Sequence, residues 1–309
     1  MTLATDRKTH AAVFAIAAVG VASAQDAIVK SMAGTYPAYE TMIIRGLASA
    51  PILITWMALT TGFAALATPS LRWLLLRGMI LATAYLAFIL AIAAMPIANA
   101  VAIYFTMPFL LSALSGKFLN EHVPAYRWLA MVAGFIGVLI MSRPGAASFE
   151  PASFLALYSA LAYAVGQMMS RSLSQKVEPI VIGNIQNAVY LSVGLLVFAV
   201  VHFVGVEASG HKSLVFLTRP FVWPTLWDAS ILAFMGALST AAMICFINAY
   251  RLAPANFVAP LEYTGMIWAV GYGLVLFGDF PDFYNWLGMA VVVSAGLWMM
   301  WKDNTHKTG

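Results

Sequence analysis

Two charged residues lie inside stretches of sequence that are otherwise apolar. Arg45 falls within Tyr39–Gly62, and Glu262 follows Pro260 within Ala255–Phe277. An ionised side chain inside a membrane costs roughly 2.5–3.5 kcal/mol on insertion scales, so both residues need a partner or a polar cavity. Their opposite charges match the carboxylate and the amine of a small zwitterion.

Each charge also has a structural interpretation. Arg45 can contact a solute, form a permanent ion pair, or extend its head group to the membrane surface. Glu262 can bind and release a proton, or it can stay paired with a cation or a neighbouring helix. Asp26 and Lys30 lie one helical turn apart, which predicts a local ion pair.

A second group of candidates consists of amide and aromatic side chains in the middle of apolar stretches. Taken singly, such residues serve helix packing more often than ligand binding. Taken together, they predict an amphipathic pocket for an organic solute rather than a bare ion. The members selected as solute contacts are Gln25, Tyr85, Tyr104, Tyr163, Asn187, Tyr263 and Trp268.

Other chemistries lack the residue patterns that they require. Gly116-Lys117 lacks the glycine spacing and the following Ser or Thr of a phosphate-binding loop. The five His residues and the single Cys show no metal-ligand spacing. A membrane enzyme acting on lipid-linked groups would need clustered acidic, His or Lys residues at one interface, and no such cluster is evident. We therefore expect no catalytic residue, no metal, no cofactor and no nucleic-acid partner.

The composition identifies the elements that must position these residues. Of 309 residues 62% are apolar and 9% are charged, with a mean hydropathy of +0.87. Soluble domains have roughly 25% charged residues, because their surfaces face water. The chain is therefore expected to be an all-α integral membrane protein.

Apolar stretches between charges and turn residues predict ten membrane spans and one long extramembrane connection, Glu207–Thr225. The start of the chain imitates a secretory signal peptide, with an Ala22-Ser23-Ala24 cleavage motif, but apolar residues resume after it, so we expect it to be retained. The predicted spans are Ala11–Met32, Tyr39–Gly62, Trp73–Ala94, Ile97–Phe118, Tyr126–Ser142, Pro151–Ser170, Ile180–Val206, Leu226–Tyr250, Ala255–Phe277 and Phe283–Trp301.

The distribution of Lys and Arg predicts the orientation. With the N-terminus inside, eleven basic residues fall on the inner side and four on the outer side, and Arg45 lies within a span. Cytoplasmic loops are enriched in Lys and Arg. Both termini are therefore expected in the cytoplasm, with the protein in the inner (plasma) membrane.

An internal repeat divides the chain into two halves, 1–145 and 146–309. A gapless shift of 158 residues pairs Thr106 with Thr264 and Trp128 with Trp286, among other matches. Five spans per half is an odd number, so the second half enters from the opposite face and the repeats have inverted topology. Pro108 and Pro260 predict helix breaks in the paired fourth and ninth spans.

Several segments resemble the EamA repeat of the drug/metabolite transporter superfamily. They are Ala-Ile-Tyr-Phe-Thr-Met-Pro-Phe at 102–109, Phe118-Leu119-Asn120-Glu121, Gly134-Phe135-Ile136-Gly137-Val138, Ala259-Pro260-Leu261-Glu262-Tyr263 and Phe277-Gly278-Asp279. Ser23-Ala24-Gln25-Asp26 through Lys30, with Arg45-Gly46, resembles the branch that contains S-adenosylmethionine and amino-acid carriers. Relatives usually have Glu where this chain has Asp279.

The resemblance implies secondary-active transport by alternating access. The expected solute is a small polar or zwitterionic metabolite, an amino acid or a related compound, with proton coupling as an option. The alternative is an exporter of S-adenosylmethionine, a cationic metabolite or a drug. The implied partners are the solute, membrane lipid and, if coupling occurs, protons. The oligomeric state stays open between monomer and homodimer.

Overall fold

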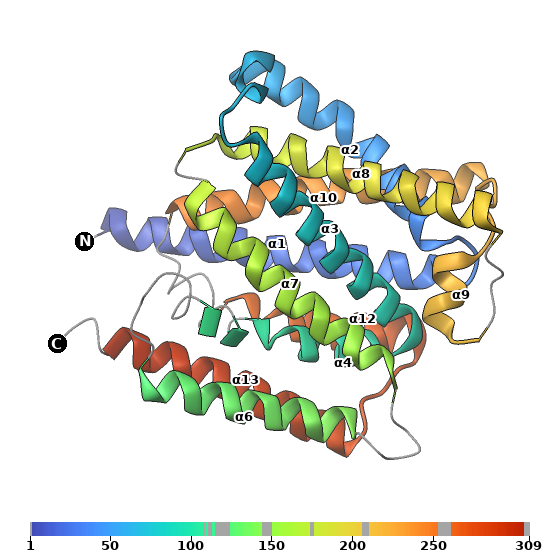
Figure 1. Ribbon diagram of the computed structural model, residues 1–309. Coiled ribbons are helices and arrows are strands. Elements are labelled where there is room, and N and C mark those ends of the chain that lie inside the picture. The colour runs from blue at the N-terminus through green and yellow to red at the C-terminus, as the bar shows by residue number, and fades with distance from the viewer. Residues whose placement is uncertain are drawn as a thin grey trace.

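The computed structural model consists of helices, and it contains no strand within the residues that it describes: 2–107, 109–110, 113–114, 124–143, 150–173, 176–205, 210–252 and 261–305. Figure 1 shows their arrangement. The helices in chain order are α1 (Thr2–Met32), α2 (Ala38–Thr60), the 3-10 helix η1 (Phe63–Leu66), α3 (Leu71–Ala94), α4 (Ile97–Tyr104), α6 (Ala125–Ser142), α7 (Ala152–Leu173), α8 (Pro179–Val204), α9 (Lys212–Thr218), α10 (Leu226–Leu252), α12 (Gly265–Phe277) and α13 (Phe283–Thr305).

Six of these helices are long and apolar enough to cross a membrane. They are α1 from Thr9 onward, α2, α3, α6, α8, and α10 as far as Phe246. Two further apolar helices are shorter, namely α12 and the part of α13 from Phe283 to Met299. The chain is therefore a multi-pass membrane protein. The count of ten spans stays a prediction, because α4, α7, α12 and α13 are not among the six.

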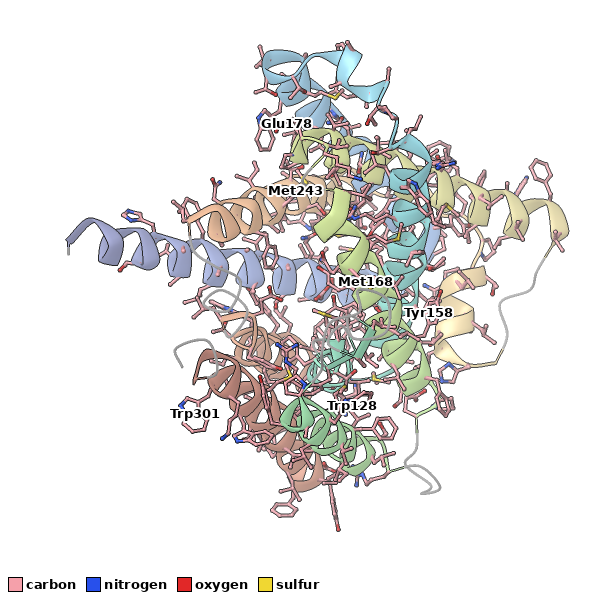
Figure 2. The ribbon with its side chains drawn as sticks, turned by 60° about the vertical axis from the view of Figure 1, so that its left-hand side comes forward. Trp128, Tyr158, Met168, Glu178, Met243 and Trp301 are labelled. Atoms are coloured by element: carbon pink, nitrogen blue, oxygen red, sulfur yellow. The ribbon has the colours of Figure 1, made fainter. Side chains whose placement is uncertain are left out.

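The outer surface of the helix bundle is suited to lipid. Large apolar side chains are exposed along most helices, with Phe203 82% and Leu226 93% exposed. Soluble monomers rarely expose such extended apolar surface. Exposed tryptophans lie near helix ends, including Trp128 on α6 and Trp301 on α13 (Figure 2). Tryptophan is enriched at both membrane interfaces, where its ring meets the head groups.

The predicted span limits agree closely with several helices. The predicted span Trp73–Ala94 corresponds to α3 (Leu71–Ala94) and Tyr126–Ser142 to α6 (Ala125–Ser142). The segment Glu207–Thr225 differs from its prediction as a loop, because it contains α9, whose Phe216 is 1% exposed and packs in the core. The buried ring of Phe216 stabilises this short helix. Sequence analysis did not predict the helix, because the residues on either side of it are polar.

Most helices pack against one principal neighbour that is distant in the sequence. Helix α1 packs on α10, α3 on α7, α2 on α8 and α6 on α13, and further contacts join α2 to α10, α3 to α8, α4 to α12, α1 to α12 and α4 to α7. In Figure 1 α6 and α13 form one layer and α2 and α8 the opposite one, with α1 and α10 between them. The start of α1 and the end of α13 lie at the same end of the bundle.

Two helical interruptions lie near the centre of the bundle. Helix α4 ends at Tyr104 and is followed by a turn at Phe105 and Thr106, and a turn at Tyr263 and Thr264 precedes α12. The rings of Phe105 and Tyr263 are in contact, with centroids 5.0 Å apart. The predicted breaks at Pro108 and Pro260 themselves lie outside the described residues.

Candidate functional site

Arg45 lies within the bundle, next to two aromatic rings. It is the eighth residue of α2, roughly 10 Å of helical rise from the start of that helix. Its guanidinium lies 4.4 Å from the ring centroid of Tyr85 on α3 and 5.6 Å from that of Tyr190 on α8. The two rings stack with centroids 5.6 Å apart. Cation–π contacts of this kind strengthen when they are removed from water.

A cavity of about 130 Å³ borders Arg45 between α2, α8 and α10. Seven of its ten lining residues have side chains that can donate or accept hydrogen bonds. Met243 of α10, labelled in Figure 2, closes one side against Gly183, where a Cβ would come within 2.9 Å of its sulfur. The lining residues are Arg45, Ser49, Leu53, Gly183, Gln186, Asn187, Tyr190, Ser239, Thr240 and Met243.

The predicted amides hold the walls of this cavity together. Asn187 lines the cavity and donates from Nδ2 to the carbonyl of Gly46 at 3.0 Å, which ties α8 to α2. Gln25 of α1 is 8% exposed, and its Oε1 accepts a hydrogen bond from the Ser239 hydroxyl at 2.8 Å. Asn187 therefore reaches the cavity directly, whereas Gln25 acts through Ser239.

Arg77 is a buried charge beside this cavity that sequence analysis missed as a candidate. The count of basic residues assigns it to the inner side, although it lies within the predicted span Trp73–Ala94. The structure places it as the seventh residue of α3, 8% exposed. Its Nε donates to the Ser170 hydroxyl at 2.6 Å and its NH1 donates to Gln186 Oε1 at 2.8 Å. Its position inside an apolar stretch was the available signal.

Gln186 connects Arg77 to the aromatic pair. Its Nε2 donates to the Tyr190 hydroxyl at 3.3 Å, and that hydroxyl donates to the Leu81 carbonyl at 3.0 Å. The Tyr85 hydroxyl is buried and finds no hydrogen-bond partner among the described residues. Two guanidiniums, two amides and two phenols thus converge from α2, α3 and α8.

Glu262 belongs to a neighbouring aromatic cluster. It lies within electrostatic reach of the hydroxyls of Tyr104, Tyr163 and Tyr263. The rings of Tyr104 and Tyr163 are in contact, with centroids 5.4 Å apart. Tyr263 is 7% exposed, and its buried hydroxyl has no hydrogen-bond partner in the part of the chain that the structure describes. Three predicted tyrosines therefore gather around the predicted carboxylate.

Trp268 lies away from both clusters. It is 39% exposed on α12, stacks on Tyr272 with centroids 6.2 Å apart, and abuts α1 at Gly20. Its contacts are those of helix packing.

Comparison with known proteins supports the resemblance found in the sequence. Residues 9–143 match the EamA-like transporter family. This match and the relatives named below support an EamA-type transporter of the drug/metabolite transporter superfamily. A riboflavin transporter of Rhizobium johnstonii is 29% identical over 214 residues, which make up 69% of this chain and 65% of that protein. An S-adenosylmethionine uptake transporter of Rickettsia conorii is 22% identical over 91% of this chain and 89% of its own length.

A solved crystal structure supports the same fold. The alignment of the two structures covers 93% of this chain and 95% of the other chain, with a TM-score of 0.56 and 17% sequence identity. The matched family and the named relatives are transporters, and these names indicate a transporter rather than an enzyme. Within the described residues of this chain no three His, Cys, Asp or Glu side chains group as metal ligands.

The predicted local pair of Asp26 and Lys30 is wrong. Lys30 Nζ instead contacts Asp279 Oδ2 at 2.6 Å and donates to the Met95 carbonyl at 3.2 Å. Asp26 lies within electrostatic reach of Arg45. Lys30 pairs with groups far away in the sequence, because tertiary contacts outweigh an i, i+4 pair worth only about 0.2–0.5 kcal/mol. Asp279, whose role the sequence left open, anchors the α12–α13 connection to α1.

Proposed function

We propose that the protein is a ten-span secondary carrier built from two inverted five-helix repeats, 1–145 and 146–309. The packing supports this, because exchanging each helix with its counterpart in the other half maps the nine most extensive helix pairs, named above, onto one another. The contact of α1 with α10 becomes that of α7 with α3, for example, and the pairs α2–α8, α4–α12 and α6–α13 become themselves. The family match at residues 9–143 coincides with the first half.

Local structure at the two interruptions adds a second support. Thr106 and Thr264 are paired by the 158-residue shift, and each hydroxyl donates to the carbonyl three residues earlier, Ile103 and Leu261, at 2.8 and 2.6 Å. Phe105 and Tyr263 are paired by the same shift and touch across the bundle. Paired helix breaks near the midplane are where inverted-repeat transporters bind solute and rearrange.

The proposed solute is a small polar or zwitterionic metabolite, an amino acid or a related compound. The observation that carries this proposal is Arg45, a charge held inside the bundle by Tyr85 and Tyr190 beside a polar cavity. A guanidinium binds a carboxylate through two parallel hydrogen bonds. Glu262, among its tyrosines, supplies the opposite charge for an amine, or exchanges a proton when the cycle is proton-coupled.

A second candidate solute has a flat ring. The stacked pair Tyr85–Tyr190 offers an aromatic surface next to Arg45. One relative is named a riboflavin transporter and another an S-adenosylmethionine uptake transporter, and both compounds contain a planar heterocycle. Offset stacking on tyrosine would hold such a ring while the polar cavity takes its substituents.

Uptake into proteoliposomes tests the proposal and separates the two candidates. Labelled amino acids, riboflavin and S-adenosylmethionine are offered to the wild type, to Arg45→Gln and to the control Arg72→Gln. Arg72 is an exposed residue at the start of α3. We expect Arg45→Gln to lower uptake at least tenfold and the control to retain it. Full uptake by Arg45→Gln would remove the central arginine from solute binding. Uptake of riboflavin or S-adenosylmethionine without amino acids would favour the second candidate.

Proton coupling has its own test in Glu262→Gln. If Glu262 exchanges protons, this variant keeps exchange of solute down its gradient but loses the pH dependence of accumulation. An unchanged pH profile would assign Glu262 to structure alone.

The orientation is tested by labelling in cells. Both termini are proposed to lie in the cytoplasm of an inner-membrane protein. A membrane-impermeant maleimide should therefore modify Lys212→Cys at the start of α9 and spare Lys302→Cys in the last turn of α13. The reverse pattern would invert the topology.

A further inference from the structure

A second cavity lies at one end of the bundle, apart from the Arg45 cavity. Its volume is about 230 Å³, and it is enclosed by the end of α3, the start of α4, the end of α6 and the starts of α7 and α13. None of its lining residues lines the Arg45 cavity. In the proposed orientation this is the external end of the molecule.

Three hydrogen-bonding atoms at this cavity are buried and unmatched. Asn99 Oδ1, Ser142 Oγ and Asn285 Oδ1 have no hydrogen-bond partner within the described part of the chain. Asn285 as a whole is 8% exposed. Buried polar atoms are nearly always hydrogen-bonded, because an unpaired one loses its contact with water and gains nothing in return. The convergence of three on one cavity indicates that something polar occupies it.

Asn285 is fixed where it stands. Its backbone N–H donates to Asp282 Oδ1 at 2.8 Å, which secures the first turn of α13. The backbone at Asn285 is therefore fixed, and its buried side-chain Oδ1 remains available to a ligand in the cavity.

The charged side chains around this cavity already have partners in the protein. Arg143 is paired with Asp282, and Glu150 contacts His211. A free ion would therefore gain little here. Two amide oxygens and a hydroxyl instead match a ligand with N–H donors and no net charge.

The volume limits the size of the ligand. A water-accessible space of about 230 Å³ is smaller than the 300–1,000 Å³ typical of drug-sized ligands. It suits a molecule with the dimensions of an amino acid.

We propose that this cavity is a second solute-binding site, which accepts a small uncharged or zwitterionic compound with an amino or amide N–H group. Its assignment as an external site rests on the proposed orientation, but its existence does not depend on which solute the central site transports. Met95 links it to the rest of the molecule, because this residue lines the cavity and its carbonyl accepts the hydrogen bond from Lys30.

Protection from chemical labelling tests the proposal. The native cysteine is removed by Cys245→Ala, and Ser153→Cys is introduced at the half-buried lining residue of α7. The rate of modification by N-ethylmaleimide in purified protein is measured with and without L-asparagine, a zwitterion with amide N–H donors. L-malate, which has no nitrogen, is the control compound. We expect saturating L-asparagine to slow labelling at least fivefold and L-malate to leave the rate unchanged.

Two variants in the same background locate the protecting site. Asn285→Leu keeps the branching at Cγ but replaces the amide with methyl groups, so we expect it to abolish protection. Arg45→Gln changes only the central cavity, so protection should persist even if transport is lost. This separates failure of the second site from failure of the proposed transport function.

Three outcomes would overturn the proposal. They are absence of protection in the parent protein, equal protection by L-malate, and protection that is lost in Arg45→Gln but kept in Asn285→Leu. The comparison of the two compounds on the parent protein decides the question if Asn285→Leu does not fold.

Discussion

Replacing Lys30 with Met should destabilise the protein more than removal of an ordinary surface charge. Lys30 joins three parts of one end of the bundle, since its ammonium contacts Asp279 at 2.6 Å, the Met95 carbonyl at 3.2 Å and the Phe277 ring at 4.8 Å. The side chains of Lys30 and Asp279 are only 15% and 29% exposed. Water therefore replaces the lost partner poorly.

The size of the effect follows from this geometry. At 2.6 Å and an effective dielectric constant of about 20, the gross attraction is about 6 kcal/mol, most of which offsets the desolvation of the two charges. Hydrogen bonds to charged groups contribute about 1.5–3 kcal/mol net. We expect Lys30→Met to lower the free energy of unfolding by about 2 kcal/mol, Asp279→Asn to have a similar effect, and the double variant to fall short of their sum by about 1–2 kcal/mol.

Unfolding by titration with SDS, followed by circular dichroism, measures all four proteins of this cycle. Lys212→Met serves as the control, because Lys212 is exposed at the start of α9. The reasoning fails if the two single effects add fully, since the residues would then be independent. It also fails if Lys30→Met is no more harmful than Lys212→Met.

Three further changes probe other contacts. Gly296→Ala places a Cβ 1.8 Å from the Tyr263 hydroxyl, so it should lower stability by about 1–3 kcal/mol in the same SDS titration; no loss would mean that Tyr263 moves freely. Gln186→Leu removes an acceptor from buried Arg77 and should cost about 1–3 kcal/mol, and a neutral result would show that another group replaces it. Acid should slightly lower the thermal stability of the wild type, and Asp282→Asn should abolish this pH effect. If the effect persists in the variant, groups other than Asp282 cause it.

The sign of the Asp282 effect follows from its environment. Burial alone would raise the pKa of Asp282, but the backbone N–H of Asn285 and the guanidinium of Arg143 outweigh it and lower the pKa. A carboxyl whose pKa is lower in the folded state stabilises the fold above its unfolded pKa, and this contribution disappears as the pH falls through the folded pKa. The loss therefore falls below about pH 4 and is small, because the side chain is 46% exposed and solvent screens the pair.

Composition and hydropathy determined the class of protein and most helix positions. For example, the apolar stretch from Trp73 to Ala94 is long enough to cross a membrane. It must then be helical, because backbone groups in lipid have to be hydrogen-bonded internally. Arg45 and Asn187 were also accessible to sequence analysis, since a charge or an amide in an apolar stretch has to find a polar partner. These inferences depend only on neighbours along the chain.

The partners of the charges were decided only by the tertiary structure. Lys30 pairs with Asp279, which is 249 residues away, instead of with Asp26, and Arg77 lies against Ser170 and Gln186 rather than at an inner surface. The buried acceptors at the end of the bundle likewise come from different helices and share no spacing in the sequence. Hydropathy fixes how deep a side chain can lie in a helix, but the side chain that it meets depends on how the helices pack and rotate against one another.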